Sequence, residues 1–271
     1  GGSTSPLHKK GEIKMTSAIY FTYDGIPSER YGLLIADFDS SNTEENEAFS
    51  PSLTALKVPC LSRFFHGGVN FDSTPTFEFS LVSQRMLTTR NRSEILSWLV
   101  GRNRFLPLQF RFADLEYFTY YCVFTAASTI YVNGECHGFR VTATFDSPYA
   151  RGIPTTVSVP SGTHTVVINN KSDIRDGYTY PKVETIAYTF DIVNTTDNAN
   201  RHFAFSGLPS GENILIDNET KIITFSDSSI NPLSYFTSKN WLRLRPGNNT
   251  LAITTNAPMT ITCPWYAMIG Y

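Results

Sequence analysis

The chain of 271 residues is poor in charge. Charged residues make up 17% of it, against about 25% in an average soluble protein. The 22 Lys and Arg nearly balance the 24 Asp and Glu, for a net charge of −2. This balance disfavours a strongly basic nucleic-acid binder. Aromatic residues reach 14%, which excludes disorder over most of the length and favours β-rich structure.

Cysteine is scarce, and its spacing matches no zinc module or disulfide scaffold. We therefore expect Cys60, Cys122, Cys136 and Cys263 to be reduced, buried thiols. No two of the five histidines lie three or four residues apart, so the sequence offers no local metal pair. Phosphate-binding glycine loops, nucleophile elbows and zinc-protease motifs are also missing. From these motifs we predict no cofactor and no metal site.

Membrane and targeting segments are not predicted. Residues 1–14 are polar and rich in Gly and Ser, and we interpret them as a disordered tag remnant ahead of a native start at Met15. Residues 117–134 and 246–271 carry no charge. Both contain Thr and Asn, and the second also contains three prolines, which would be costly in lipid.

Alternation of apolar and polar residues dominates the first half of the chain. Residues 76–82, 106–112 and 139–145 place an apolar side chain at every second position, which is typical of strands with one buried face. The segment Asn91–Gly101 instead carries apolar residues at helical spacing. We predict a helix there, with its first residue as the N-cap and its last as the stop.

The second half is again rich in strands and turns. Residues 147–152 read as a linker, and after it we predict strands at 163–168 and 183–192 and a hairpin at 213–225. Two more alternating segments flank a turn at residues 256–258. Several short strands at this spacing predict a β-sandwich.

Two charged runs could have a function. Residues 37–47 hold five carboxylates, but Asn42 and Ala48 stand where a calcium loop needs Gly and Glu. A solvated acidic loop is the plain interpretation. Residues 85–111 hold six arginines and no lysine. They could form a solvated helix rim or a nucleic-acid surface, although the acidic run would repel phosphate.

A third interpretation uses both runs together. A head-to-tail ring needs two different, complementary patches on each protomer, and arginine binds carboxylates in forked pairs. The candidate ring-interface residues are Asp37, Asp39, Glu44, Glu45, Glu47, Arg90, Arg92 and Arg104.

Several segments carry a resemblance to a known family. They are Ile19–Gly25 with Ser28 and Tyr31–Leu33, Glu94–Leu99 with Phe105–Leu108, Gly211–Asp217, and Trp241–Leu251. In this order and spacing they resemble the distal tail protein family of siphophages, the long-tailed, non-contractile bacteriophages. The resemblance covers nearly the whole chain from Met15.

The resemblance implies a mainly β fold with two domains. Residues 15–150 would form a β-sandwich-like belt domain with one α-helix, and residues 151–271 a galectin-like β-sandwich. Belt domains would close into a ring, in this family a hexamer, that links the tail tube to the baseplate or tail tip and leaves a channel for DNA. The role would be structural, in a virion protein made in the host cytoplasm. The implied partners are other copies of the chain, the major tail protein, the tape measure protein, the tail-associated tip protein and receptor-binding proteins.

Other classes of function stay open at this point. A carbohydrate-binding module could contact the host cell wall, and an enzyme such as a wall hydrolase could be built from residues that meet only in space. Galectins bind sugar with a His-Asn-Arg set above a Trp, and the segment His202–Phe205 lacks the Asn and Arg at matching places. The aromatic residues at 117–121 could fill the cores or serve a subunit interface.

Overall fold

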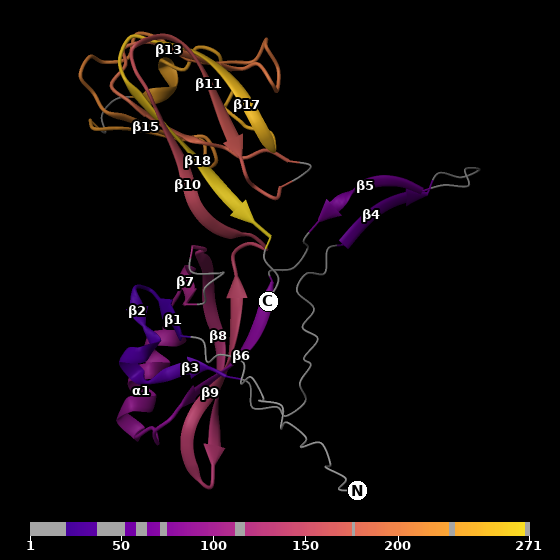
Figure 1. The fold of residues 1–271 in the computed structure, drawn as a ribbon, viewed down its shortest axis with the longest axis vertical. Coiled ribbons are helices and arrows are strands. Elements are labelled where there is room, and N and C mark those ends of the chain that lie inside the picture. Colours follow the sequence, from indigo (N-terminus) through magenta and orange to yellow (C-terminus); the bar gives the residue numbers. More distant parts are fainter. Residues whose placement is uncertain are drawn as a thin grey trace, which may run out of the picture. The chain divides into compact units, whose positions relative to one another are not determined.

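The computed structural model describes residues 20–36, 52–57, 64–70, 75–111, 117–174, 177–227 and 231–268 (Figure 1). These residues form antiparallel sheets and one α-helix, which confirms the predicted fold class. The chain divides into two compact units. The N-terminal unit comprises residues 1–116 and 121–146, and the C-terminal unit comprises residues 117–120 and 147–271.

The N-terminal unit is built on a seven-stranded sheet with the order β2-β1-β7-β8-β9-β6-β3. Its strands are β1 (Tyr20–Tyr23), β2 (Ile26–Pro27), β3 (Leu33–Ile35), β6 (Thr76–Ser83), β7 (Leu106–Arg111), β8 (Tyr120–Val132) and β9 (Glu135–Phe145). A short 3-10 helix, η1 (Ser28–Tyr31), lies between β2 and β3. The three strands predicted from alternation correspond to β6, β7 and the second part of β9.

The sheet curls around its own apolar side chains. β1 contacts β3, although the two lie near opposite ends of the strand order. Phe79 of β6 also lies against Phe110 of β7, with ring centroids 5.9 Å apart, while β8 and β9 separate these strands in the sheet. The two halves of the sheet therefore face each other across one core, which gives the sandwich-like arrangement.

The helix α1 (Thr89–Leu99) begins three residues earlier than predicted, since its N-cap is Thr88 rather than Asn91. Thr88 is the N-cap, and its hydroxyl accepts a hydrogen bond from the Asn91 backbone N–H at 3.3 Å. The prediction of Asn91 as the cap was therefore wrong, because Thr88 offers the same chemistry one turn earlier. The helix ends at Leu99 with Val100 as the C-cap in a right-handed conformation, so Gly101 is not a left-handed stop.

The chain leaves the sheet between β3 and β6, two strands that pair with each other. This 36–75 connection contains β4 (Ser52–Lys57) and β5 (Phe64–Asn70). The two strands pair antiparallel in a sheet of their own, and neither pairs with any other strand in the described part of the chain (Figure 1).

The C-terminal unit is a β-sandwich of a five-stranded sheet, β10-β18-β12-β15-β16, and a four-stranded sheet, β11-β17-β13-β14. The strands are β10 (Ala150–Val159), β11 (Gly162–Asn170), β12 (Lys182–Thr185), β13 (Phe190–Asn194), β14 (His202–Phe205), β15 (Ile214–Asp217), β16 (Ile222–Phe225), β17 (Gly247–Thr255) and β18 (Met259–Ala267), with the 3-10 helix η2 (Pro232–Ser234) after β16. Buried side chains from both sheets form its core.

Two predictions for this half need correction. Residues 183–192 form two strands rather than one, because the chain crosses from β12 in one sheet to β13 in the other. The predicted linker at 147–152 already contains the start of β10, which pairs with β18 from Ala150 onwards. The hairpin at 213–225 is confirmed as β15 and β16.

Three of the four cysteines lie in described parts of the chain, and all three are buried free thiols, as predicted. Burial raises the pKa of Cys122 above its usual range and that of Cys263 to about 11. Cys60 lies outside the described residues. Among the helices that the structure describes, none is long and apolar enough to cross a membrane.

Candidate assembly surface

The predicted ring-interface residues fall into three groups. The five carboxylates at positions 37–47 lie outside the described residues. Arg90 and Arg92 lie in the first turn of α1, and Arg104 lies in the loop beyond the other end of this helix. An 11-residue helix spans about 16 Å at 1.5 Å per residue, so the structure does not gather the three arginines at one point.

The arginine run also divides by what its members bind. Arg102 pairs with Asp24 at 3.0 Å, and Arg111 pairs with Glu29 of η1. These two arginines therefore join elements within the N-terminal unit. Among the described residues, Arg85 and Arg104 are exposed and form no ion pair.

Arg90 and Arg92 differ in how firmly they are held. Arg90 is exposed and pairs with Glu94 one turn along α1, at 3.1 Å, an arrangement that stabilises a helix by only about 0.3–0.5 kcal/mol. Arg92 is half-buried, and its two terminal nitrogens donate to Tyr131 Oη at 3.1 Å and to Thr89 Oγ1 at 2.9 Å. The guanidinium of Arg92 is therefore held in place without a carboxylate partner in the described part of the chain.

The exposed apolar side chains beside the first turn of α1 were not predicted from the sequence. Tyr131 and Val132 lie at the tip of the β8–β9 hairpin and are 57% and 44% exposed. The turn is Asn133-Gly134, and both residues have positive φ (51° and 85°), as a type I′ turn requires. The Asn-Gly pair between two alternating segments was a usable signal for this hairpin. Nothing in the sequence showed that its tip would be left uncovered.

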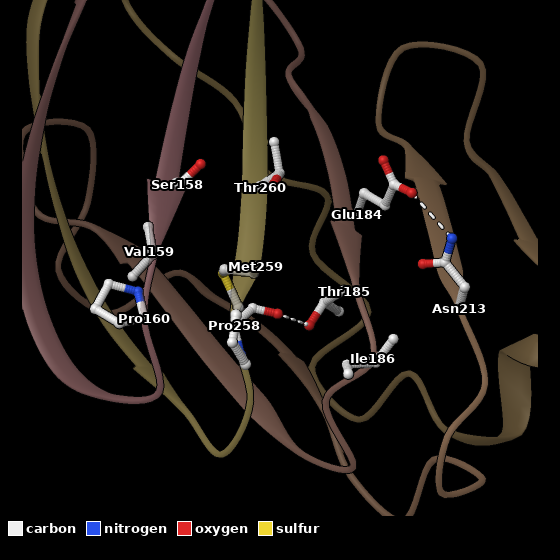
Figure 2. Close-up of a pocket in the computed structure, with 10 residues that line it drawn as sticks. All are labelled: Ser158, Val159, Pro160, Glu184, Thr185, Ile186, Asn213, Pro258, Met259 and Thr260. Carbon is white, nitrogen blue, oxygen red and sulfur yellow. Dashed lines mark hydrogen bonds between the residues drawn. The ribbon is translucent and has the colours of Figure 1, made fainter.

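In the C-terminal unit, an open groove of about 480 Å³ lies at the ends of β10, β12 and β18 (Figure 2). Glu184 accepts a hydrogen bond from Asn213 at 2.9 Å on one side of it, and the Thr185 hydroxyl donates to the Pro258 carbonyl at 3.0 Å. Hydroxyl, carboxylate and amide groups such as these can bind a sugar. None of the ten residues that line the groove is aromatic, so it lacks the ring on which a sugar usually stacks.

The residues considered for lectin activity have structural partners in this unit. His202 lies 2.7 Å from Asp191 on the neighbouring strand, and the Trp241 ring packs against Phe236 with centroids 5.0 Å apart. In the described part of the chain, no three His, Cys, Asp or Glu side chains cluster in a way that could hold a metal ion.

A charge cluster around the buried Asp197 carboxylate holds two loops of the C-terminal unit together. The Asp197 side chain is 2% exposed and binds Arg243 at 2.8 Å and Arg245 at 3.1 Å. Burial alone would raise the pKa of Asp197, but the hydrogen bonds and charges of the two arginines outweigh it and lower the pKa below its usual value. The Arg243 guanidinium also lies 3.9 Å from the Tyr178 ring centroid. The cluster is fully occupied by its own members and reads as structural.

Two protein-family models match the chain. One, described as a phage tail protein N-terminal domain, matches residues 16–147, and the other, described as a phage tail C-terminal domain, matches residues 149–263. The chain belongs to this phage tail protein family. The two matches leave only short terminal segments of the tail protein unmatched.

Solved structures show the same fold. The tail protein is similar to the Dit protein of phage SPP1, with a TM-score of 0.67 and 15% sequence identity. The match covers 92% of this chain and 99% of that chain. The SPP1 protein is described as a paradigm of the hub adsorption apparatus in phages that infect Gram-positive bacteria. It is also similar to a chain of the phage p2 baseplate in its activated conformation, with a TM-score of 0.51, 9% identity, and coverage of 91% and 98%. Comparison with curated protein sequences gave no match. The prediction of a phage tail protein with the fold of the distal tail proteins is thus confirmed.

Proposed function

We propose that this tail protein is a distal tail protein whose N-terminal units form a ring, a hexamer, between the tail tube and the baseplate. The ring would leave a channel through which DNA passes. The protein's role would be architectural rather than enzymatic, within the tail tip of a virion whose proteins are made in the host cytoplasm. The family matches and the fold shared with the SPP1 Dit protein support this proposal.

The observation that carries the ring proposal is the 36–75 connection. A two-stranded hairpin alone is only marginally stable in water, and further strands or a packed helix are needed to stabilise it. Within the described part of the chain, β4 and β5 pair only with each other. A neighbouring protomer would supply the missing contacts, and the acidic run lies in the same connection, just before β4.

The charge runs are the proposed polar part of the ring interface. Carboxylates from one protomer would meet arginines of the next, in the head-to-tail arrangement that closes a ring. The residues proposed for this contact are Asp37, Asp39, Glu44, Glu45, Glu47, Arg90, Arg92 and Arg104. Association through such exposed charges should weaken as salt rises.

The proposed partners follow from the position of the ring. Its two faces would contact the major tail protein on one side and the tail-associated tip protein on the other, with the tape measure protein in the channel. The C-terminal sandwich, which we propose is galectin-like, would lie outside the belt and offer an attachment point for receptor-binding proteins.

A carbohydrate-binding module is the second candidate, and the groove at Glu184 and Asn213 is the observation that favours it. Binding to purified host cell walls that is lost in Glu184→Ala, with the sandwich still folded, would favour this alternative.

Sedimentation of the purified full chain over a range of concentrations tests the ring. We expect a discrete high-order species at low salt, and we expect joint charge reversal of Arg90, Arg92 and Arg104 to weaken it. If that triple variant assembles like the wild type at both low and high salt, the charge runs do not form the interface.

A further inference from the structure

An apolar patch lies at one end of the N-terminal sheet. Tyr131 and Met86, which we call the hairpin-tip patch, are 57% and 50% exposed. Tyr131 lies opposite Cys136 of β9 in the sheet, and the Cys136 carbonyl accepts a hydrogen bond from the backbone N–H of Leu87 at 2.8 Å. The segment that carries Met86 therefore lies at the same end of the sheet as the hairpin tip.

Cations flank this patch. Arg92 donates to the Tyr131 hydroxyl, and its Nε is buried with no hydrogen-bond partner among the described residues. Arg85 precedes Met86 and is exposed. The acids at this end are Glu94, which pairs with Arg90, and Glu135, which lies 3.7 Å from His137. Arg85 and Arg92 are therefore left without a carboxylate in the described part of the chain.

The composition of this surface is that of an interface centre. Tyr, Met and Arg are enriched at the buried centres of protein interfaces, and Tyr and Arg are among the residues that contribute most to binding. Tyr131 and Arg92 fix each other through their hydrogen bond, so less conformational entropy is lost when a partner binds.

Charge indicates what binds here. The run at positions 37–47 holds five carboxylates and one aromatic residue, Phe38. Such a segment complements two unpaired arginines around an apolar centre.

The strand directions favour a segment from another copy. β3 runs antiparallel to β6, with Leu33 opposite Ser83 and Ile35 opposite Leu81, and the Ala36 N–H bonds to the Ser80 carbonyl. At Ala36 the chain is therefore running away from the Ser83 end of β6. Met86 follows that end of β6 in the sequence, so the chain is also running away from the patch. Its own acidic run would have to turn back to reach the patch.

We propose that the hairpin-tip patch, with Arg85 and Arg92, is the docking surface for the acidic run of a second copy of this chain. The inference rests on the proposed ring and adds the apolar centre of the contact. Arg104, beyond the other end of α1, lies outside this surface.

Sedimentation of full-length variants tests the surface. We expect Tyr131→Ser to raise the dissociation constant of the assembly by about tenfold or more. The matched control is Tyr188→Ser, which removes a 51% exposed tyrosine from the C-terminal unit and should have no effect. Arg92→Glu should weaken assembly, while Arg140→Glu, on the outward face of the same sheet, should not.

Mixed cross-linking separates a second copy from the same chain. Two single variants, Ser41→Cys and Met86→Cys, are mixed and oxidised, and we expect a disulfide between the two different chains. A bond that forms only when both substitutions are in one chain would overturn the proposal, because the acidic run would then bind its own protomer.

The remaining outcomes are distinguishable. If the wild type forms rings and Tyr131→Ser and Arg92→Glu form them equally well, this docking surface is wrong while the proposed ring stands. If the wild type stays monomeric at every concentration and the mixed cysteines do not cross-link, the docking surface has no affinity for a second copy and the proposal is overturned.

Discussion

Trp98 anchors α1, the helix that carries Arg90 and Arg92, to the N-terminal sheet. Its Nε1–H donates to the Tyr23 carbonyl oxygen at 3.1 Å, and its ring lies 5.8 Å from the Phe21 ring. The indole is buried, so its removal leaves a cavity between the helix and β1.

The size of the effect follows from these contacts. Replacing a buried Trp by Ala costs about 3–5 kcal/mol of the free energy of unfolding. Trp98→Phe keeps an aromatic ring in place and removes the N–H donor, so we expect a cost of about 1–2 kcal/mol. Both variants should also loosen the last turn of α1, where Trp98 contacts β1.

Urea unfolding followed by circular dichroism measures the free energies, and hydrogen exchange of the peptides from residues 89–99 reports on the helix. Trp241→Phe, in the other unit, is the control and should leave exchange in α1 unchanged. A cost for Trp98→Phe as large as that for Trp98→Ala, or unchanged exchange in α1 in both variants, would contradict the anchoring role of Trp98.

Three further predictions concern other parts of the chain. Cys263, whose pKa burial raises to about 11, should not react with a thiol reagent at pH 8 until the protein is unfolded, and rapid labelling of Cys263 in the native protein, located by peptide mass mapping, would contradict its burial. Thr88→Ala should lower the free energy of unfolding by about 1 kcal/mol through loss of the N-cap, as urea unfolding can measure. Asp197→Asn should cost about 2–3 kcal/mol at neutral pH, because it leaves two arginines without their buried carboxylate. Since the folded-state pKa of Asp197 is lowered, its contribution is present above about pH 4 and is lost as the pH falls through that pKa, so wild type and variant should converge in urea unfolding at acid pH.

Local periodicity predicted the strands well where one face is buried. β6, β7 and β9 alternate as their sequences indicate, because each covers a single core. The break between β12 and β13 was not predictable in this way, since both strands are apolar and the crossing between sheets is a tertiary event. The helix start was predicted wrongly because Asn91 and Thr88 can both serve as an N-cap, and the sequence alone does not decide between them.

The candidate surface was only partly predictable. The sequence indicated an arginine run, but not that Arg102 and Arg111 bind within their own unit while Arg92 is fixed by Tyr131. Exposure of Tyr131 and Met86 depends on which strands end beside them. Such exposure appears only once the sheet is assembled.

Negatively stained images of the purified full chain test the central claim most directly. A ring-forming distal tail protein predicts class averages with six-fold symmetry and a central opening. Particles that remain single protomers at concentrations where sedimentation detects association, or assemblies without an opening, would contradict it.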